Sequence, residues 1–181
     1  SALETVAGRV AERSLAAISG ERSAGERLVR FALNHFDRIH SQRAFQSLMQ
    51  QELVRLQQGE EHALTPIIEK VFRPMMSRLK ELLAEGMRNR ELIRVDEWQM
   101  MYAALGANVF YFLSGPVMGM LEAGDPFEPR LLRARRKAAI EYLGQTIFVD
   151  RKRGARVAAR VLDETPMPAS RDFRKFEVKG K

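Results

Sequence analysis

Three histidines are the side chains of this sequence best suited to bind a metal ion or move a proton near neutral pH. His35 and His40 are five residues apart, which places them on different faces of a helix, and His62 lies in a polar stretch. The sequence has no cysteine, no Glu-x-x-His pair, no glycine-rich phosphate loop and no Gly-x-Ser-x-Gly motif. We therefore expect no metal site, no cofactor and no enzymatic activity.

Methionine and aromatic side chains form the second group with functional potential, because they adapt well to an apolar ligand. Ordinary core packing is the alternative, since methionine also fills irregular gaps. A proline in the middle of a helical stretch, Pro74, favours a cavity because a kinked helix leaves space beside it. The candidate ligand-binding residues, two of them polar, are Phe45, Met49, Phe72, Met75, Met76, Met101, Tyr102, Asn108 and Phe112. Such a site favours a small apolar effector with one or two hydrogen-bonding groups and disfavours a charged one.

The central element that would position these residues is a predicted helix over Glu97–Met120, with no charge between Glu97 and Glu122. Asp96 and Gln99 are spaced as a capping box at its start, and Gly115-Pro116 interrupts it near its end. Its large apolar residues recur at helical spacing on one face: Trp98, Met101, Tyr102, Leu105, Val109 and Phe112. A helix that is apolar all round must be buried on both sides or cross a membrane. We favour burial between the core and a second subunit. The expected dimer interface combines Ala103, Ala104, Ala107 and Tyr111 with Leu131, Ala138, Ala139, Tyr142 and Thr146.

The remaining apolar periodicity predicts an all-α bundle of about six helices. Ser23 and Glu26 form a capping box for the second helix, and Thr65 and Pro66 suit the start of the fourth. The third helix is expected to turn Ala44, Phe45, Leu48, Met49, Leu53 and Leu56 inward. The helices besides the central one are predicted over Ala2–Ile18, Ser23–His40, Gln42–Gln57, Thr65–Arg88 and Pro129–Phe148. In the last of these, Arg133, Arg135, Arg136 and Lys137 are expected to face solvent.

The positive charge is concentrated at the C-terminal end. The formal net charge is +7, and residues 150–181 contain ten Lys and Arg against five Asp and Glu. We therefore divide the chain into a helical effector-binding and dimerisation domain, residues 1–148, and a basic extension, residues 149–181, with a possible short helix near Ala155–Leu162. Arg151, Lys152, Arg153, Arg156 and Arg160 are able to contact phosphates without reading sequence, but a solvated extension is the commoner form of such a run.

Two stretches resemble a known family. The run from Leu79 to Gln99, LKELLAEGMRNRELIRVDEWQ, is followed by an apolar helix with Gly106, a loop with Pro126 and Pro129, and an amphipathic helix. This order, with the segment Phe45–Leu53 before it, resembles the C-terminal regulatory domain of TetR-family transcriptional repressors over about Leu3 to Phe148. The resemblance implies an all-helical domain that binds an effector and forms a homodimer through its last two helices, here Glu97–Met120 and Pro129–Phe148.

The same resemblance implies that DNA is bound only by a helix-turn-helix domain, which these residues do not include. The effector would then shift the helix that links the two domains, here Ala2–Ile18, and so change the spacing of the two DNA readers. No secretion signal or disulfide chemistry is indicated, so we expect a cytoplasmic protein. The alternatives are a helical enzyme or carrier for an apolar small molecule and a membrane-associated helical protein.

Overall fold

The computed structural model describes residues 8, 12, 14–121, 125 and 127–168. Within these residues the chain is all-α, and its only extended pairing is an isolated antiparallel bridge between Leu92 and Phe148. Most of the expected helix Ala2–Ile18 lies outside the described residues, although residues 14–18 are helical. None of the described helices is long and apolar enough to cross a membrane.

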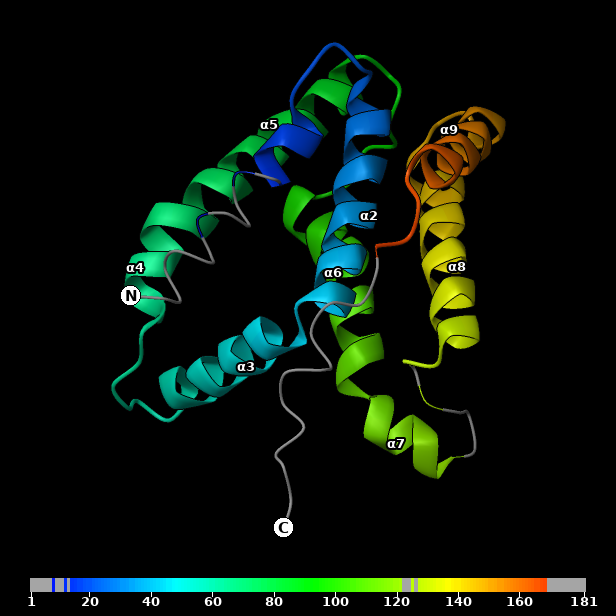
Figure 1. Ribbon diagram of the computed structural model, residues 1–181. Coiled ribbons are helices and arrows are strands. Elements are labelled where there is room, and N and C mark those ends of the chain that lie inside the picture. Colours follow the sequence, from blue (N-terminus) through cyan, green and yellow to red (C-terminus); the bar gives the residue numbers. More distant parts are fainter. Residues whose placement is uncertain (1–7, 9–11, 13, 122–124, 126, 169–181) are drawn as a thin grey trace.

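The all-α expectation is confirmed, with six described helices of seven residues or more. In Figure 1, α2 runs through the middle of the bundle, α8 and α9 lie side by side next to it, and α3 extends away from the lower end of α2. The elements in chain order are α2 (Ala24–Ser41), α3 (Arg43–Gln57), α4 (Leu64–Ile67), the π-helix η1 (Ile68–Phe72), α5 (Arg73–Arg88), α6 (Glu97–Leu113), α7 (Gly115–Met120), α8 (Pro129–Ile147) and α9 (Arg151–Glu164).

Side-chain caps define three of the helix starts. The Ser23 hydroxyl accepts a hydrogen bond from the Glu26 backbone N–H at 3.3 Å, and Asp96 accepts one from Gln99 at 3.0 Å. Asp150 caps α9 in the same way through Arg153. These contacts satisfy backbone donors that the first helical turn leaves free. The Glu26 carboxylate does not complete the predicted box, because it binds arginines instead.

The fourth predicted helix is divided at the position of its proline. A five-residue π-helical segment, η1, ends at Phe72, and the Arg73 N–H bonds to the carbonyl of Ile68. Pro74 then occupies the first turn of α5, where its missing N–H costs little. The start differs from the prediction: Ala63, not Thr65, is the N-cap, and Thr65 lies inside α4.

The outward face of α3 is more apolar than expected. Only Met49 and Glu52 of α3 are buried, whereas the predicted inward residues Ala44, Leu48, Leu53 and Leu56 are exposed. The reason is that α3 extends away from α2 and packs mainly on the short α4, so only one narrow stripe of it meets other helices.

The main core includes α9, which lies within the expected basic extension. Val157, Ala158 and Val161 of α9 are buried in the same cluster as Leu28, Leu83 and Ile140. A Cβ placed on Gly144 of α8 would lie 2.6 Å from the carbonyl oxygen of Gly154, so two glycines allow these helices to touch backbone to backbone. This packing corrects the expectation of a solvated extension as far as Glu164; residues 169–181 lie outside the described part.

Candidate functional site

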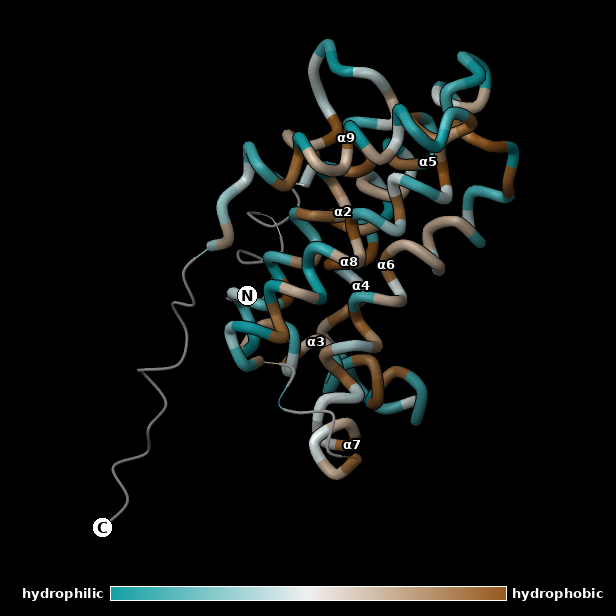
Figure 2. Tube along the Cα trace, turned by 90° about the vertical axis from the view of Figure 1, so that its right-hand side faces the viewer, coloured by the Kyte–Doolittle hydropathy of each residue, from teal (hydrophilic) through white to brown (hydrophobic). Residues whose placement is uncertain are grey.

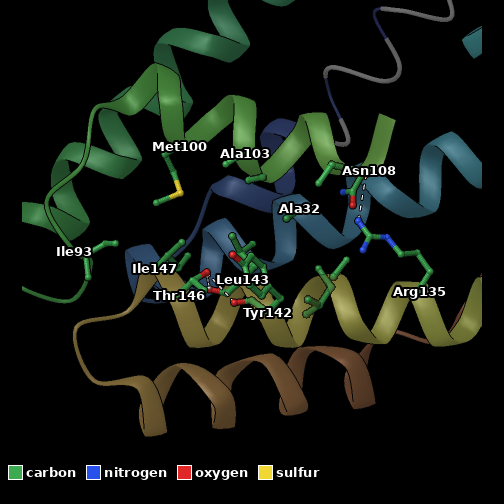
Figure 3. A pocket seen from close by; sticks show the side chains of 14 residues that line it. Ala32, Ile93, Met100, Ala103, Asn108, Arg135, Tyr142, Leu143, Thr146 and Ile147 are labelled. Atoms are coloured by element: carbon green, nitrogen blue, oxygen red, sulfur yellow. Dashed lines mark hydrogen bonds between the residues drawn. The ribbon is translucent and has the colours of Figure 1, made fainter. Parts of the chain in front are cut away.

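A groove of about 430 Å³ lies between α6 and α8, with Ala32 of α2 at its base. Both helices pack against α2 but make few contacts with one another, as Figure 3 shows. The groove remains unfilled because the residues facing it from α6 and α8 include four alanines, whose side chains cannot bridge the gap. The groove is lined by these four alanines and by larger apolar residues: Ala103, Ala104, Ala107 and Ala139, with Ile93, Met100, Ile140, Leu143 and Ile147.

Two polar side chains lie together at one end of the groove. Asn108 of α6 is 2% exposed, lines the groove, and has no side-chain hydrogen bond within the described part of the chain. Arg135 reaches across from α8, and its Nη2 donates to the carbonyl oxygen of Ala107 at 3.2 Å. Figure 3 shows Asn108 and Arg135 at the right, and Ile93, Met100 and Ile147 at the other end. The groove therefore has a polar end and an apolar end.

The remaining polar groups of the lining are already bonded or lie at its mouth. The Thr146 hydroxyl donates to the carbonyl oxygens of Tyr142 and Leu143 on its own helix, at 2.8 and 3.3 Å. The Tyr142 side chain is 71% exposed. Asn108 and Arg135 are thus the groups best placed to orient a ligand.

The neighbouring arginine of α8 points to the opposite side. Arg136 is 6% exposed and forms two hydrogen bonds with the Asp37 carboxylate, at 2.7 and 2.8 Å, and a third with the carbonyl oxygen of Thr165. Burial raises the pKa of Asp37, and the hydrogen bonds and charge of Arg136 offset only part of that effect. This pair ties α8 to α2 inside the bundle.

The expected dimer-interface residues lie on or beside the same face as the groove. Ala103, Ala107, Ala138, Tyr142 and Thr146 are exposed, and Ala104, Tyr111, Leu131 and Ala139 are partly buried. Large apolar side chains outside the groove lining are also exposed on α6 and α7, and Figure 2 shows the tube of α7 mainly in the white and brown tones of apolar residues. The exposed members are Trp98, Tyr102, Phe110, Leu113 and Val117. These positions recur every three, four or eight residues, which is one side of a helix.

The structure distributes the expected ligand-binding residues over several places. Phe45, Met49 and Phe72 belong to a small cluster beside η1, while Met75, Met76 and Met101 belong to the main core, where Phe72 also packs. Phe112 is in a third cluster with Phe36. Asn108 lines the groove between α6 and α8.

Tyr102 is a correction to the inward-facing set. Its side chain is 68% exposed. The rotation of α6 turns Met100, Met101 and Asn108 toward the core, so Tyr102 points outward. Trp98 is also exposed, although the sequence grouped it with the buried stripe.

The histidines are separated, and the described residues contain no group of three metal-ligating side chains. Burial and the charge of Arg38 lower the pKa of His35 to about 3, and its Nδ1 atom is buried without a partner. Burial also lowers the pKa of His40. His62 accepts a hydrogen bond from the Leu64 N–H and helps to start α4.

Cations that the sequence placed in solvent have structural partners. Arg153 and Arg160 of α9 bind Glu91 and Glu26, so they are engaged within the fold. The arginines of α8 were likewise expected to face solvent. Their helical spacing, however, indicates that two of them lie on the buried face and the groove face. Arg136 continues the buried series Leu132, Ile140, Leu143 and Ile147, and Arg135 continues the groove series Ala139, Tyr142 and Thr146.

A family model described as "Tetracyclin repressor-like, C-terminal domain" matches residues 23–143, from the N-cap of α2 into α8. Neither a curated protein nor a solved structure matches the chain. The match covers more than half of the chain and includes all the groove-lining residues except Thr146 and Ile147. The chain therefore belongs to the family of tetracyclin repressor-like C-terminal domains.

Proposed function

We propose that this chain is the effector-binding and dimerisation domain of a TetR-type transcriptional repressor. A small, largely apolar effector would control DNA binding by a helix-turn-helix domain outside these 181 residues. Two copies of the chain would pair through α6 and α8. Membership of the family supports a regulatory role, and the exposed face of α6 and α8 supports the pairing.

The observation that carries the proposal is the apolar face itself. Tyr102, Phe110 and Tyr142 are each more than 60% exposed, and no charged residue lies between Glu97 and Glu122. Exposed aromatic and apolar side chains of this kind are typical of protein interfaces, where aromatic residues are enriched. A two-fold axis beside α6 and α8 would cover the same patch on both copies.

The N-terminal helical segment supplies a route from this domain to a preceding one. Arg38 of α2 donates to the Ser14 hydroxyl at 2.6 Å, and Arg27 donates to the carbonyl oxygen of Ile18. Ile18 is buried in the main core. A shift of α2 on effector binding would therefore displace the segment before it. The effector acts only as far as its affinities for the two arrangements differ.

The pairing is tested by adding a charge to the face. At a two-fold interface an arginine at position 138 would meet its own copy, so we expect Ala138→Arg to raise the dimer dissociation constant by at least about tenfold. Analytical ultracentrifugation over a concentration series measures this change. Ala159→Arg is the matched control, because Ala159 is exposed on α9, on the other side of α8 from α6.

Two results would contradict the proposal. The first is a wild-type chain that stays monomeric at micromolar concentration while remaining folded. The second is an Ala138→Arg variant that dimerises as strongly as wild type and the Ala159→Arg control. A coding sequence directly upstream that encodes no helix-turn-helix would separately contradict the repressor assignment.

A further inference from the structure

The polar end of the groove between α6 and α8 contains hydrogen-bonding groups that neither helix provides with a partner. Asn108 is 2% exposed, its amide lies on the groove, and no side-chain hydrogen bond to it occurs within the described residues. Buried amides in folded proteins are nearly always hydrogen-bonded. Because this amide lies on the lining of a cavity, a ligand is able to provide the missing bond.

Arg135 also has a side-chain nitrogen without a hydrogen-bond partner, and it carries a positive charge. Its Nη2 binds one carbonyl oxygen, its Nε is buried without a partner, and no acidic side chain pairs with it among the described residues. Its Cζ atom lies 5.5 Å from the centroid of the Tyr111 ring, a cation–π contact that supplies no negative charge. The adjacent Arg136 shows the alternative, since two carboxylate oxygens and a carbonyl oxygen surround it. The ligand group that completes Arg135 is therefore an anion.

The rest of the groove restricts what the anion is attached to. The wall from Met100 to Asn108 is about 12 Å long at the rise of an α-helix, and its other end is formed by Ile93, Met100 and Ile147. Thr146, the polar residue at that end, has its hydroxyl bonded to its own backbone. A group with a single negative charge matches the single unpaired guanidinium, and a carboxylate matches its planar geometry.

We propose that the groove binds a carboxylate with an apolar chain, its headgroup between Asn108 and Arg135 and its chain along Ala104 and Leu143 toward Ile93. The inference deepens the proposed function and rests on it, because the groove opens on the face through which the two copies pair. A bound chain would then lie at the subunit interface, where its presence changes how α6 and α8 meet the second copy.

Decanoate is a suitable probe, because its extended chain has a length comparable to the groove, and decan-1-ol is its uncharged counterpart. Isothermal titration and thermal shift on the full chain measure binding of both. We expect decanoate to bind at least about tenfold more tightly than decan-1-ol, because a charge-assisted pair is stronger than a neutral hydrogen bond.

Substitutions identify the site. Arg135→Gln should weaken decanoate at least about tenfold and leave decan-1-ol nearly unchanged, because only the charge-assisted contact is lost. Asn108→Leu should weaken both probes, and Ala104→Leu should abolish both by filling the groove. Arg133→Gln is the matched control, since Arg133 is an exposed arginine of the same helix that does not line the groove.

Sedimentation of the same samples separates the two proposals. A dimer that does not bind decanoate, or binds it equally well after Arg135→Gln, overturns the ligand site and leaves the pairing intact. A monomer that binds decanoate through Arg135 supports the ligand site and overturns the proposed pairing.

Discussion

The two sides of α8 differ in how completely they are filled. Toward α2 and α9, glycines bring backbones into contact and Arg136 is enclosed by oxygen atoms. Toward α6, alanines leave a groove and Arg135 retains an unpartnered nitrogen. Adjacent residues of one helix therefore have opposite roles: Arg136 stabilises the subunit, whereas Arg135 is available to a ligand. The side of α8 that faces α2 and α9 is therefore tightly packed, and the side that faces α6 is open to a ligand.

The largest effect should come from separating the buried ion pair. Asp37→Ala leaves Arg136 charged and enclosed without its partner, so we expect a loss of about 3–5 kcal/mol in the free energy of unfolding. Urea denaturation measures the loss. Arg135→Met is the matched test on the open side and should change stability by less than about 1 kcal/mol, because it removes an arginine that no acidic residue pairs with. Equal losses in the two variants would abolish the distinction between the two sides.

The glycine contact should give the next largest effect. A Cβ on Gly154 would fall on the carbonyl oxygen of Gly144 and lie 2.8 Å from the Phe148 ring, so α9 must move away from α8. We expect Gly154→Ala to cost about 3 kcal/mol, at the upper end of the usual range for overpacking. Denaturation monitored by circular dichroism tests this value. A variant as stable as wild type would show that the two helices do not approach through their backbones.

The acid sensitivity that His35 of α2 confers should be smaller. His35 takes up a proton near pH 6.5 when unfolded but only near pH 3 when folded, because burial and Arg38 disfavour its charged form. The unfolded state therefore binds more protons between these values, and stability falls as the pH drops, by about 2 kcal/mol from pH 7 to pH 5. His40, whose pKa is also lowered, acts in the same direction, and the raised pKa of Asp37 acts in the opposite one.

Replacement of His35 separates these contributions. His35→Gln should reduce the slope of unfolding free energy against pH, and His35→Gln with His40→Gln should reduce it further. Denaturation curves at pH 7, 6 and 5 supply the slopes. An unchanged slope in the double variant would mean that neither histidine is held neutral by the fold.

Sequence reasoning succeeded where the signal is local. The caps at Ser23 and Asp96 depend on residues three positions apart, and the interruption at Pro74 follows from a missing N–H, so both were predictable. The order of helices was sufficient to indicate the family. Asn108 was also predicted to be a polar residue of a ligand site; it lines the groove between α6 and α8, and its role toward a ligand stays a prediction.

Sequence reasoning failed where the packing of neighbouring helices determines which way a side chain points. Because α6 has no charged face, its apolar pattern sets no rotation, and Tyr102 and Trp98 were assigned to the wrong side. The sequence indicated a short helix near Ala155–Leu162 but not its burial, because the packing of α9 depends on a contact between glycines of two different helices. Arg135 was considered solvated because charge usually indicates exposure. The expectation of an uncharged effector followed from that placement, and the carboxylate proposed above departs from it.

The smallest effect should come from the matching glycine on the open side. A Cβ on Gly106, in the middle of α6, meets nothing within 4 Å, in contrast to Gly154. Alanine is favoured over glycine inside a helix by about 0.8–1.0 kcal/mol, so Gly106→Ala should stabilise the chain by up to that amount. Gly106 also lies between Tyr102 and Phe110 on the proposed interface. Urea denaturation at low and high protein concentration separates the two contributions, because only the dimer term depends on concentration. A gain at both concentrations places the partner's helices away from Gly106, whereas a gain that disappears at high concentration means that the partner's backbone approaches it. A loss at low concentration would contradict the prediction, because it would mean that the open side is as tightly packed at Gly106 as the closed side is at Gly154.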